Sequence, residues 1–324
     1  MLGGALVACS SGPSQINSAV IIGDRVISVD DVQNRLDQAL RVEPATKELA
    51  KNHKLDLVSR GILNELVRHE LLAEAARREG LTVSEKDVSD VVAATEPSQD
   101  PVQRSIEAAF DRKDVFRDRL LAVEYGRKMV GKVQLTMNGI VIGVAGYTRQ
   151  KATDLAKQIA AKPDRVAELS AAAGGGGDRT RPLSNFPYNV VTSYAGAAQS
   201  AGQTGQAPDP NDMLPPLFAA PSNSVVALPL GGGGEDGAGG GGGFLIALIK
   251  HDGGGVSGDE AAQAGQIPPD WLFVLGEHLI GPLAKEVGLR VSPRYGVWDD
   301  LAVGVAPSEA EKVGVLVPAS TAKP

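Results

Sequence analysis

Apolar residues along much of the first 131 positions recur at spacings of three and four, which predicts a series of amphipathic helices. Residues 18–29, "SAVIIGDRVISV", instead alternate apolar and polar positions on either side of a Gly-Asp pair, and this predicts two short strands joined by a turn. A helix is expected directly afterwards, because Ser28 and Asp31 have the spacing of a capping box.

The same spacing predicts one long helix over about 46–79. Gly80 ends it, and Ser84 begins the next helix in the phrase "GLTVSEKDV". Residues 102–131 predict another amphipathic helix or a broken pair of helices. The first 131 residues therefore indicate a mainly helical unit.

The pattern changes near position 132, where "VQLTMNGIVIGV" is apolar and β-branched and predicts a strand. One or two helices follow, then a region rich in Gly, Pro and Ser that contains two apolar phrases, "LPPLFAAPSNSVVALPL" and "GFLIALIKH". Helical spacing returns from 267 and is expected to end at Gly288, before a strand over 289–298. Because that strand alternates as residues 18–29 do, we expect the two to pair as antiparallel strands.

Composition excludes several classes of protein. A formal charge of −7 and a pI near 5.3 argue against nucleic acid as a partner, because phosphate binding needs clustered Lys and Arg. No apolar run approaches the ~18–20 residues of a membrane span. The chain is therefore expected to be soluble beyond its first residues.

Candidate chemistry is sparse. The four histidines lack metal-site spacing, so we expect no metal and no cofactor. No Gly-x-Ser-x-Gly nucleophile motif is present. The glycine runs between 174 and 255 lack the pattern of a phosphate-binding loop. They predict flexible connections, or positions where glycine stands in for a residue that could not be read. We predict no catalytic residue.

The single cysteine, Cys9, follows a short apolar run and precedes "SSGPS". A polar, turn-prone stretch of this kind does not enclose a thiol in a core. "LVAC" resembles the lipobox of bacterial lipoproteins, which implies that Cys9 carries a lipid and that residues 1–17 are the remnant of a signal peptide and a linker. "MLGGALVA" is shorter than the ~7–15 apolar residues and basic start of a complete signal peptide.

Three phrases in this order resemble the SurA/PrsA group of secreted foldases: "AVIIGDRVISVDDVQNRL", "LLAEAARREGLTVSEKDV" and "GLRVSPRYGVWD". The resemblance implies a mainly α protein with an α+β insert. A helical chaperone domain would comprise 18–131 together with 267–302, closed by paired N- and C-terminal strands. A parvulin-like module would occupy 132–256, and 303–324 would form a C-terminal tail.

Two positions depart from active parvulins, which carry a histidine in the first strand and another in the closing strand. Here the first strand contains Ile140 and the closing strand contains Leu245, while His251 is expected beyond the closing strand. The module is therefore expected to be degenerate and without isomerase activity, although an active prolyl isomerase remains an alternative.

These observations predict an extracytoplasmic, lipid-anchored, chaperone-like protein, in the periplasm or on the outer face of the cytoplasmic membrane. Its partners would be unfolded or exported polypeptides, with the membrane contacted through Cys9. The alternative is an accessory subunit that binds one fixed envelope protein. Four aromatic residues are candidates for binding apolar client segments, although such residues also serve as core: Phe110, Phe116, Trp271 and Phe273.

Overall fold

The computed structural model describes residues 17–144, 146–174, 179–204, 209–213, 216–230, 243–253, 255–256 and 258–320. Cys9, with most of the segment predicted as a signal remnant and linker, lies outside these ranges. Among the described residues, no helix combines the length and apolar content needed to cross a bilayer.

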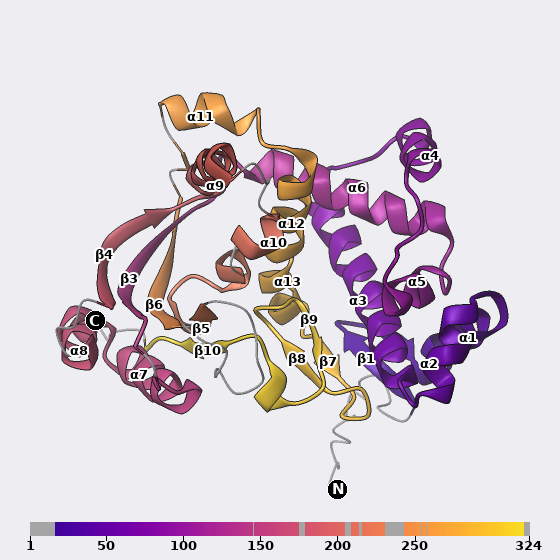
Figure 1. Ribbon diagram of the computed structural model, residues 1–324, viewed down its shortest axis with the longest axis horizontal. Helices are drawn as coiled ribbons and strands as arrows, with labels where there is room; N and C mark the ends of the chain where they lie inside the picture. The colour runs from indigo at the N-terminus through magenta and orange to yellow at the C-terminus, as the bar shows by residue number, and fades with distance from the viewer. Residues whose placement is uncertain are drawn as a thin grey trace, which may run out of the picture.

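Mainly α structure with a β portion is confirmed (Figure 1). The first part of the chain contains β1 (Ser18–Ile22), β2 (Arg25–Ser28), α1 (Val29–Val42), α2 (Pro44–Lys51), α3 (Leu55–Glu79), α4 (Glu85–Ala94), α5 (Pro101–Glu107) and α6 (Arg112–Met129). The middle contains β3 (Gln134–Ile142), α7 (Arg149–Ala161), η1 (Pro163–Arg165), α8 (Val166–Gly174), β4 (Thr180–Tyr188), α9 (Val190–Thr204), α10 (Pro210–Met213), η2 (Pro216–Ala219), β5 (Ser224–Leu230) and β6 (Gly243–Asp252). The last part contains α11 (Asp259–Ala264), α12 (Pro269–Leu279), α13 (Gly281–Glu286), β7 (Arg290–Val291), β8 (Val297–Asp299), β9 (Gly304–Ala306), η3 (Glu309–Glu311) and β10 (Val315–Pro318).

The predicted helix boundaries near the start of the chain are confirmed. Ser28 and Asp31 form a capping box at α1, and the Ser84 hydroxyl accepts a hydrogen bond from the Asp87 amide at 3.1 Å. Gly80 ends α3 in the left-handed conformation, with φ of 64°. These features depend on a few neighbouring residues, so the sequence identifies them directly.

Two longer predictions need correction. The helix expected over 46–79 is two helices, because the chain turns between α2 and α3 with His53 in the left-handed region at φ of 56°. The strand expected over 289–298 pairs with β1 only through β7, where Val291 lies opposite Val20. Pro293 follows β7 in a turn, and the chain then forms the β8–β9 hairpin.

The middle of the chain folds around a five-stranded antiparallel sheet in the order β10-β5-β6-β3-β4. The two faces of β6 belong to different cores. Leu245 and Ile249 face the core shared with α12, and Ile246 and Leu248 face the core formed with α7. Residues 303–320, expected as part of a tail, instead form β9, η3 and β10, and β10 is an edge strand of this sheet (Figure 1).

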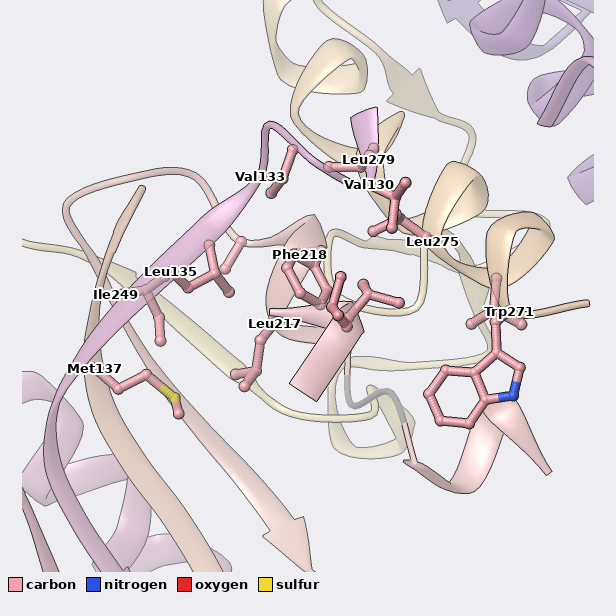
Figure 2. Packing of buried hydrophobic residues seen from close by; sticks show 14 of the residues in the cluster. Val130, Val133, Leu135, Met137, Leu217, Phe218, Ile249, Trp271, Leu275 and Leu279 are labelled. Carbon is pink, nitrogen blue, oxygen red and sulfur yellow. The ribbon is translucent and has the colours of Figure 1, made fainter. Parts of the chain in front are cut away.

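The helical and sheet regions share one continuous core. Val123 and Val130 from α6 and the following residue belong to the same buried cluster as Leu135 in β3 and Leu275 in α12. Figure 2 shows apolar side chains of this cluster meeting between the sheet and α12. The change in sequence character near position 132 therefore does not coincide with a break in packing.

Helices α6 and α12 approach each other through two glycines. A Cβ atom at Gly126 would lie 2.0 Å from the Leu272 carbonyl oxygen, and one at Gly276 would lie 2.0 Å from the Ala122 carbonyl oxygen. Each glycine thus faces the backbone of the other helix, and any side chain would force the helices apart.

We expect Gly126→Ala and Gly276→Ala each to destabilise the protein, because the added methyl collides with backbone that no rotamer change can move. Overpacking of this kind costs about 1–3 kcal/mol. Chemical denaturation measures the effect. Gly265→Ala is the control, since Gly265 has a φ of −69° and a Cβ atom added there would have no other atom within 4 Å. Equal stability of all three variants would contradict the close approach.

His278 lies on the same face of α12 as Leu275 and Trp271, which precede it by one and two helical turns. Its Nδ1 is buried without a hydrogen-bond partner among the described residues. Burial lowers the pKa of His278 to about 4. The folded state therefore binds a proton more weakly than the unfolded state does.

The stability contributed by neutral His278 should be fully present above about pH 6.5 and should be lost as pH falls toward 4, by on the order of 3 kcal/mol at most. We expect His278→Leu to flatten the dependence of unfolding free energy on pH in this window, as measured by denaturation at about pH 7, 5.5 and 4.5. His53→Asn, at an exposed turn position, is the control. A slope unchanged by His278→Leu would refute the assignment.

Candidate functional site

A pocket of about 320 Å³ lies between α3, α6 and α12, and its remaining wall is formed by α5 and the segment that connects α4 to α5. We call it the α3–α6–α12 pocket. Its apolar lining comes from three helices: Leu72, Val115, Phe116 and Phe273. Charged side chains surround this apolar lining, so the pocket offers both apolar area and polar groups.

The Arg119 side chain lies near both aromatic rings of the pocket, Phe116 and Phe273. The Arg119 guanidinium carbon lies 5.8 Å from the Phe116 ring centroid and 5.0 Å from the Phe273 ring centroid. Arg112 lies 5.4 Å from the Phe116 ring. Cationic groups over aromatic faces hold the rings in place while leaving apolar area available.

An ion-pair network forms part of the pocket wall. Arg68 in α3 contacts Glu65 at 2.6 Å and Glu277 in α12 at 2.7 Å. Burial raises the pKa of Glu277, and the charge of Arg68 acts in the opposite direction. The network fixes α12 against α3, which sets the position of Phe273.

Two further contacts fix the wall of the pocket. Arg112 donates hydrogen bonds to the carbonyl oxygens of Thr95 at 2.5 Å and Val92 at 3.4 Å, which fastens the end of α4 to α6. His69 Nδ1 lies 2.8 Å from Asp118 Oδ2, and this hydrogen bond raises the pKa of His69. The walls are thus held by contacts between helices.

Two of the four predicted client-binding aromatic residues line this pocket, and two do not. Phe110 packs against the helical core with Arg35 at 4.4 Å above its ring. Trp271 is 3% exposed and packs edge-on to Tyr194, with ring centroids 5.3 Å apart. Trp271 is therefore a core residue, and Phe110 is a partly buried residue that packs against the core.

Arg119 and the acidic residues of the pocket were not identified from the sequence. Phe116 and Arg119 have the one-turn spacing that places two residues on one helix face. That spacing is too common to single out a site, and Phe273 lies in a distant segment. Only the packing of α6 on α12 reveals the pocket.

The sheet contains the two positions at which a histidine was expected for prolyl isomerase activity. Ile140 and Leu245 are buried at 2% and 5% exposure in β3 and β6. Asn138 accepts a hydrogen bond from the Asn185 amide at 2.8 Å.

His251 lies within β6 rather than beyond it, which corrects its expected position. Its Nε2 donates to the Ala220 carbonyl oxygen at 2.8 Å, because a carbonyl can only accept. Within the described ranges, no cluster of three or more His, Cys, Asp or Glu side chains could hold a metal ion.

Comparison with known proteins gives one match. Residues 5–119 match the SurA-like N-terminal domain, a stretch that runs from before β1 into α6. No curated protein and no solved structure matches the chain significantly. The match supports a relation of this part of the chain to the SurA/PrsA group, because residues 5–119 are similar to a SurA-like N-terminal domain.

Proposed function

We propose that this protein is an extracytoplasmic, lipid-anchored chaperone that holds apolar segments of exported polypeptides in the α3–α6–α12 pocket. The observation that carries the proposal is the coincidence of two features in one region. Residues 5–119 match a SurA-like domain, which suggests a chaperone-like role in periplasmic folding, and most of the pocket walls come from helices within or overlapping that match.

The size and lining of the pocket suit weak, reversible binding. A volume of about 320 Å³ accommodates one or two large apolar side chains rather than a folded domain. Each buried apolar Å² contributes about 25 cal/mol, so a single inserted side chain gives modest affinity. A holding chaperone needs this property, because a client must dissociate in order to fold.

Large hydrophobic side chains with high exposure, among the described residues, come from separate segments of the chain: Val26, Val42, Leu57, Val144 and Val313. An accessory subunit that binds one fixed envelope protein is the alternative function, and copurification separates the two.

The insert is proposed to be a degenerate parvulin-like module without isomerase activity. Its expected pieces occur in the expected order, as α7 and α8, then η2, β5 and β6. Ile140 and Leu245 are apolar, and His251 is engaged with a backbone carbonyl. A pocket without preorganised polar groups binds ground and twisted states alike, and uniform binding does not accelerate isomerisation.

Val115→Asp should weaken client binding roughly five- to tenfold, or about 1.0–1.4 kcal/mol, because it places a carboxylate on the apolar lining. Position 115 lies in the first turn of α6, where an acidic residue is compatible with the helix. The measurement is fluorescence anisotropy with a labelled, permanently unfolded protein such as carboxymethylated α-lactalbumin.

Val42→Asp is the matched control, since Val42 is 63% exposed in α1 and does not line the pocket. Unchanged binding by Val115→Asp would reject the pocket as the client site. Affinity purification from membranes separates the alternatives: many substoichiometric proteins indicate a chaperone, and one stoichiometric protein indicates a subunit.

Purified protein should leave the isomerisation rate of a prolyl peptide at its uncatalysed value, because Ile140 and Leu245 are buried apolar residues that lie on opposite faces of the sheet and so do not form one polar site. A protease-coupled assay measures this rate. A clear acceleration that Asn138→Ala abolishes would show that the insert is an enzyme.

Cys9→Ser should release the protein from the membrane fraction, because the substitution removes the proposed site of lipid attachment. Cell fractionation and mass spectrometry of the parent protein test this. Retention of the variant in the membrane pellet, at the level of the parent, would exclude an anchor at Cys9.

A further inference from the structure

The chain that leads to the last described strand connects the β8–β9 hairpin to the five-stranded sheet. After the β8–β9 hairpin, the chain crosses to the sheet, where β10 pairs antiparallel with β5 (Figure 1). We call residues 313–320 the C-terminal segment. It occupies an edge that β5 would otherwise present to solvent.

The C-terminal segment fits the β5 edge with alternating side chains. Val315 and Val317 pack on the core beside α7, and Leu316 packs on the core of the opposite face. The backbone pairs Val315 with Ala227 and Val317 with Val225. The β5 edge thus accepts an extended strand whose apolar side chains point alternately to the two faces of the sheet.

Backbone bonds continue past the end of β10. The Ala319 amide donates to the Asn223 carbonyl at 3.0 Å, and the Ser320 amide donates to the Ala160 carbonyl at 2.7 Å. These two acceptors lie on the turn before β5 and in the last turn of α7. The β5 edge and the end of α7 therefore bind the main chain of this segment beyond the paired strand.

Polar contacts secure the start of the C-terminal segment. The buried carboxylate of Asp299 accepts a hydrogen bond from the Val313 amide at 2.6 Å. Arg149 in α7 donates to the Lys312 carbonyl at 2.7 Å. A cavity of about 360 Å³ lies beside these contacts, lined by Arg149, Lys312 and Val315 among others. These contacts fix the chain just before it joins the sheet.

The two paired strands differ in burial. Residues 224–228 of β5 are all buried, with 0–3% exposure, whereas every residue of β10 is half-buried or exposed. An apolar strand with an open edge is a template for another extended chain. Removing β10 would leave the β5 edge open as such a template.

We propose that the β5 edge beside α7 is a strand-addition site for extended polypeptide segments with alternating apolar residues, and that the C-terminal segment occupies it as a displaceable internal ligand. The site is separate from the α3–α6–α12 pocket. Both sites would bind unfolded polypeptide. The β5 edge would recognise an extended main chain, whereas the pocket would bind a single inserted side chain.

The test is a full-length variant whose C-terminal segment can be locked. In a Cys9→Ser background, Ala227→Cys with Val315→Cys places two thiols on directly paired residues. The probe is a fluorescent peptide with the sequence of residues 313–320, VGVLVPAS. We expect the peptide to bind the reduced protein and not the oxidised protein.

Weakening the polar contacts should strengthen binding, because apparent affinity scales with the fraction of molecules whose edge is open. Asp299→Asn should raise peptide affinity roughly tenfold or more. Arg149→Gln, which removes a half-buried side chain at the surface of α7, is the second variant if Asp299→Asn does not fold. Hydrogen exchange of residues 315–318 verifies that the segment has loosened.

Val141→Cys with Arg181→Cys gives a matched control lock, because these residues pair between β3 and β4 at the other side of the sheet. This lock should leave peptide binding intact. The proposal is overturned if a folded variant with rapid exchange in 315–318 binds the peptide no better than the locked protein, or if both locks abolish binding equally. Val115→Asp should not alter peptide binding, so failure here is distinguishable from failure of the pocket proposal.

Discussion

The rest of the structure depends on the direct backbone contact between α6 and α12, which Gly126 and Gly276 make possible. At this distance each helix packs against the carbonyl oxygens of the other. The contact brings Phe116 and Phe273 to one pocket, although they lie in segments far apart in sequence. It also places the buried side of α12 against the sheet, which gives the two regions a shared core. Small residues are required because the geometry leaves no volume for a Cβ atom.

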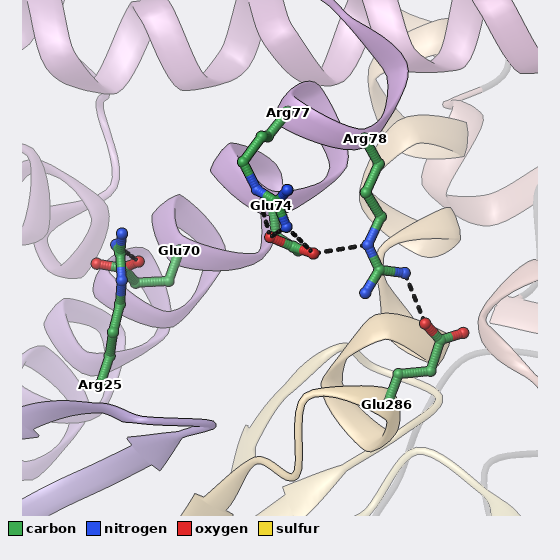
Figure 3. A network of polar contacts seen from close by, with 6 residues as sticks. All are labelled: Arg25, Glu70, Glu74, Arg77, Arg78 and Glu286. Atoms are coloured by element: carbon green, nitrogen blue, oxygen red, sulfur yellow. Dashed lines mark hydrogen bonds and ion pairs between the residues drawn. The ribbon is translucent and has the colours of Figure 1, made fainter.

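Ion pairs add orientation to this contact at modest energetic gain. Arg68 pairs with Glu277 at the pocket wall, where partial burial reduces solvent screening. A second connection, Arg78 with Glu286, joins α3 to α13 near the surface at 2.6 Å (Figure 3). Solvent screens this exposed pair, so it fixes helix orientation more than it stabilises the fold. Together the two pairs hold α12 and α13 against α3.

The chain returns twice toward segments that precede it. Strand β7 adds to β1, and β10 adds to β5, so the last described elements contact both the first strand and the middle of the chain. These returns explain why the insert is not an independent unit in packing terms. They also place a short, weakly buried strand on an apolar edge, where a polypeptide partner of similar pattern would meet the same hydrogen-bonding groups. The proposed binding of apolar segments and the pairing of β10 with β5 thus both use main-chain hydrogen bonds between strands.

Local features were determined by the sequence alone. The capping box at Ser28, the left-handed Gly80 and the β1–β2 turn each depend on residues within a few positions, and the order of the insert's apolar phrases indicated its strands. Tertiary structure decided the rest. Trp271, a candidate for binding client segments, is a buried core residue. His251 lies inside β6, and part of the expected tail forms an edge strand of the sheet. The site residue Arg119 became visible only when two distant rings met on either side of it. The physical reason is that periodicity reports which face of an element is apolar, whereas the partner of that face is chosen by packing across the whole chain.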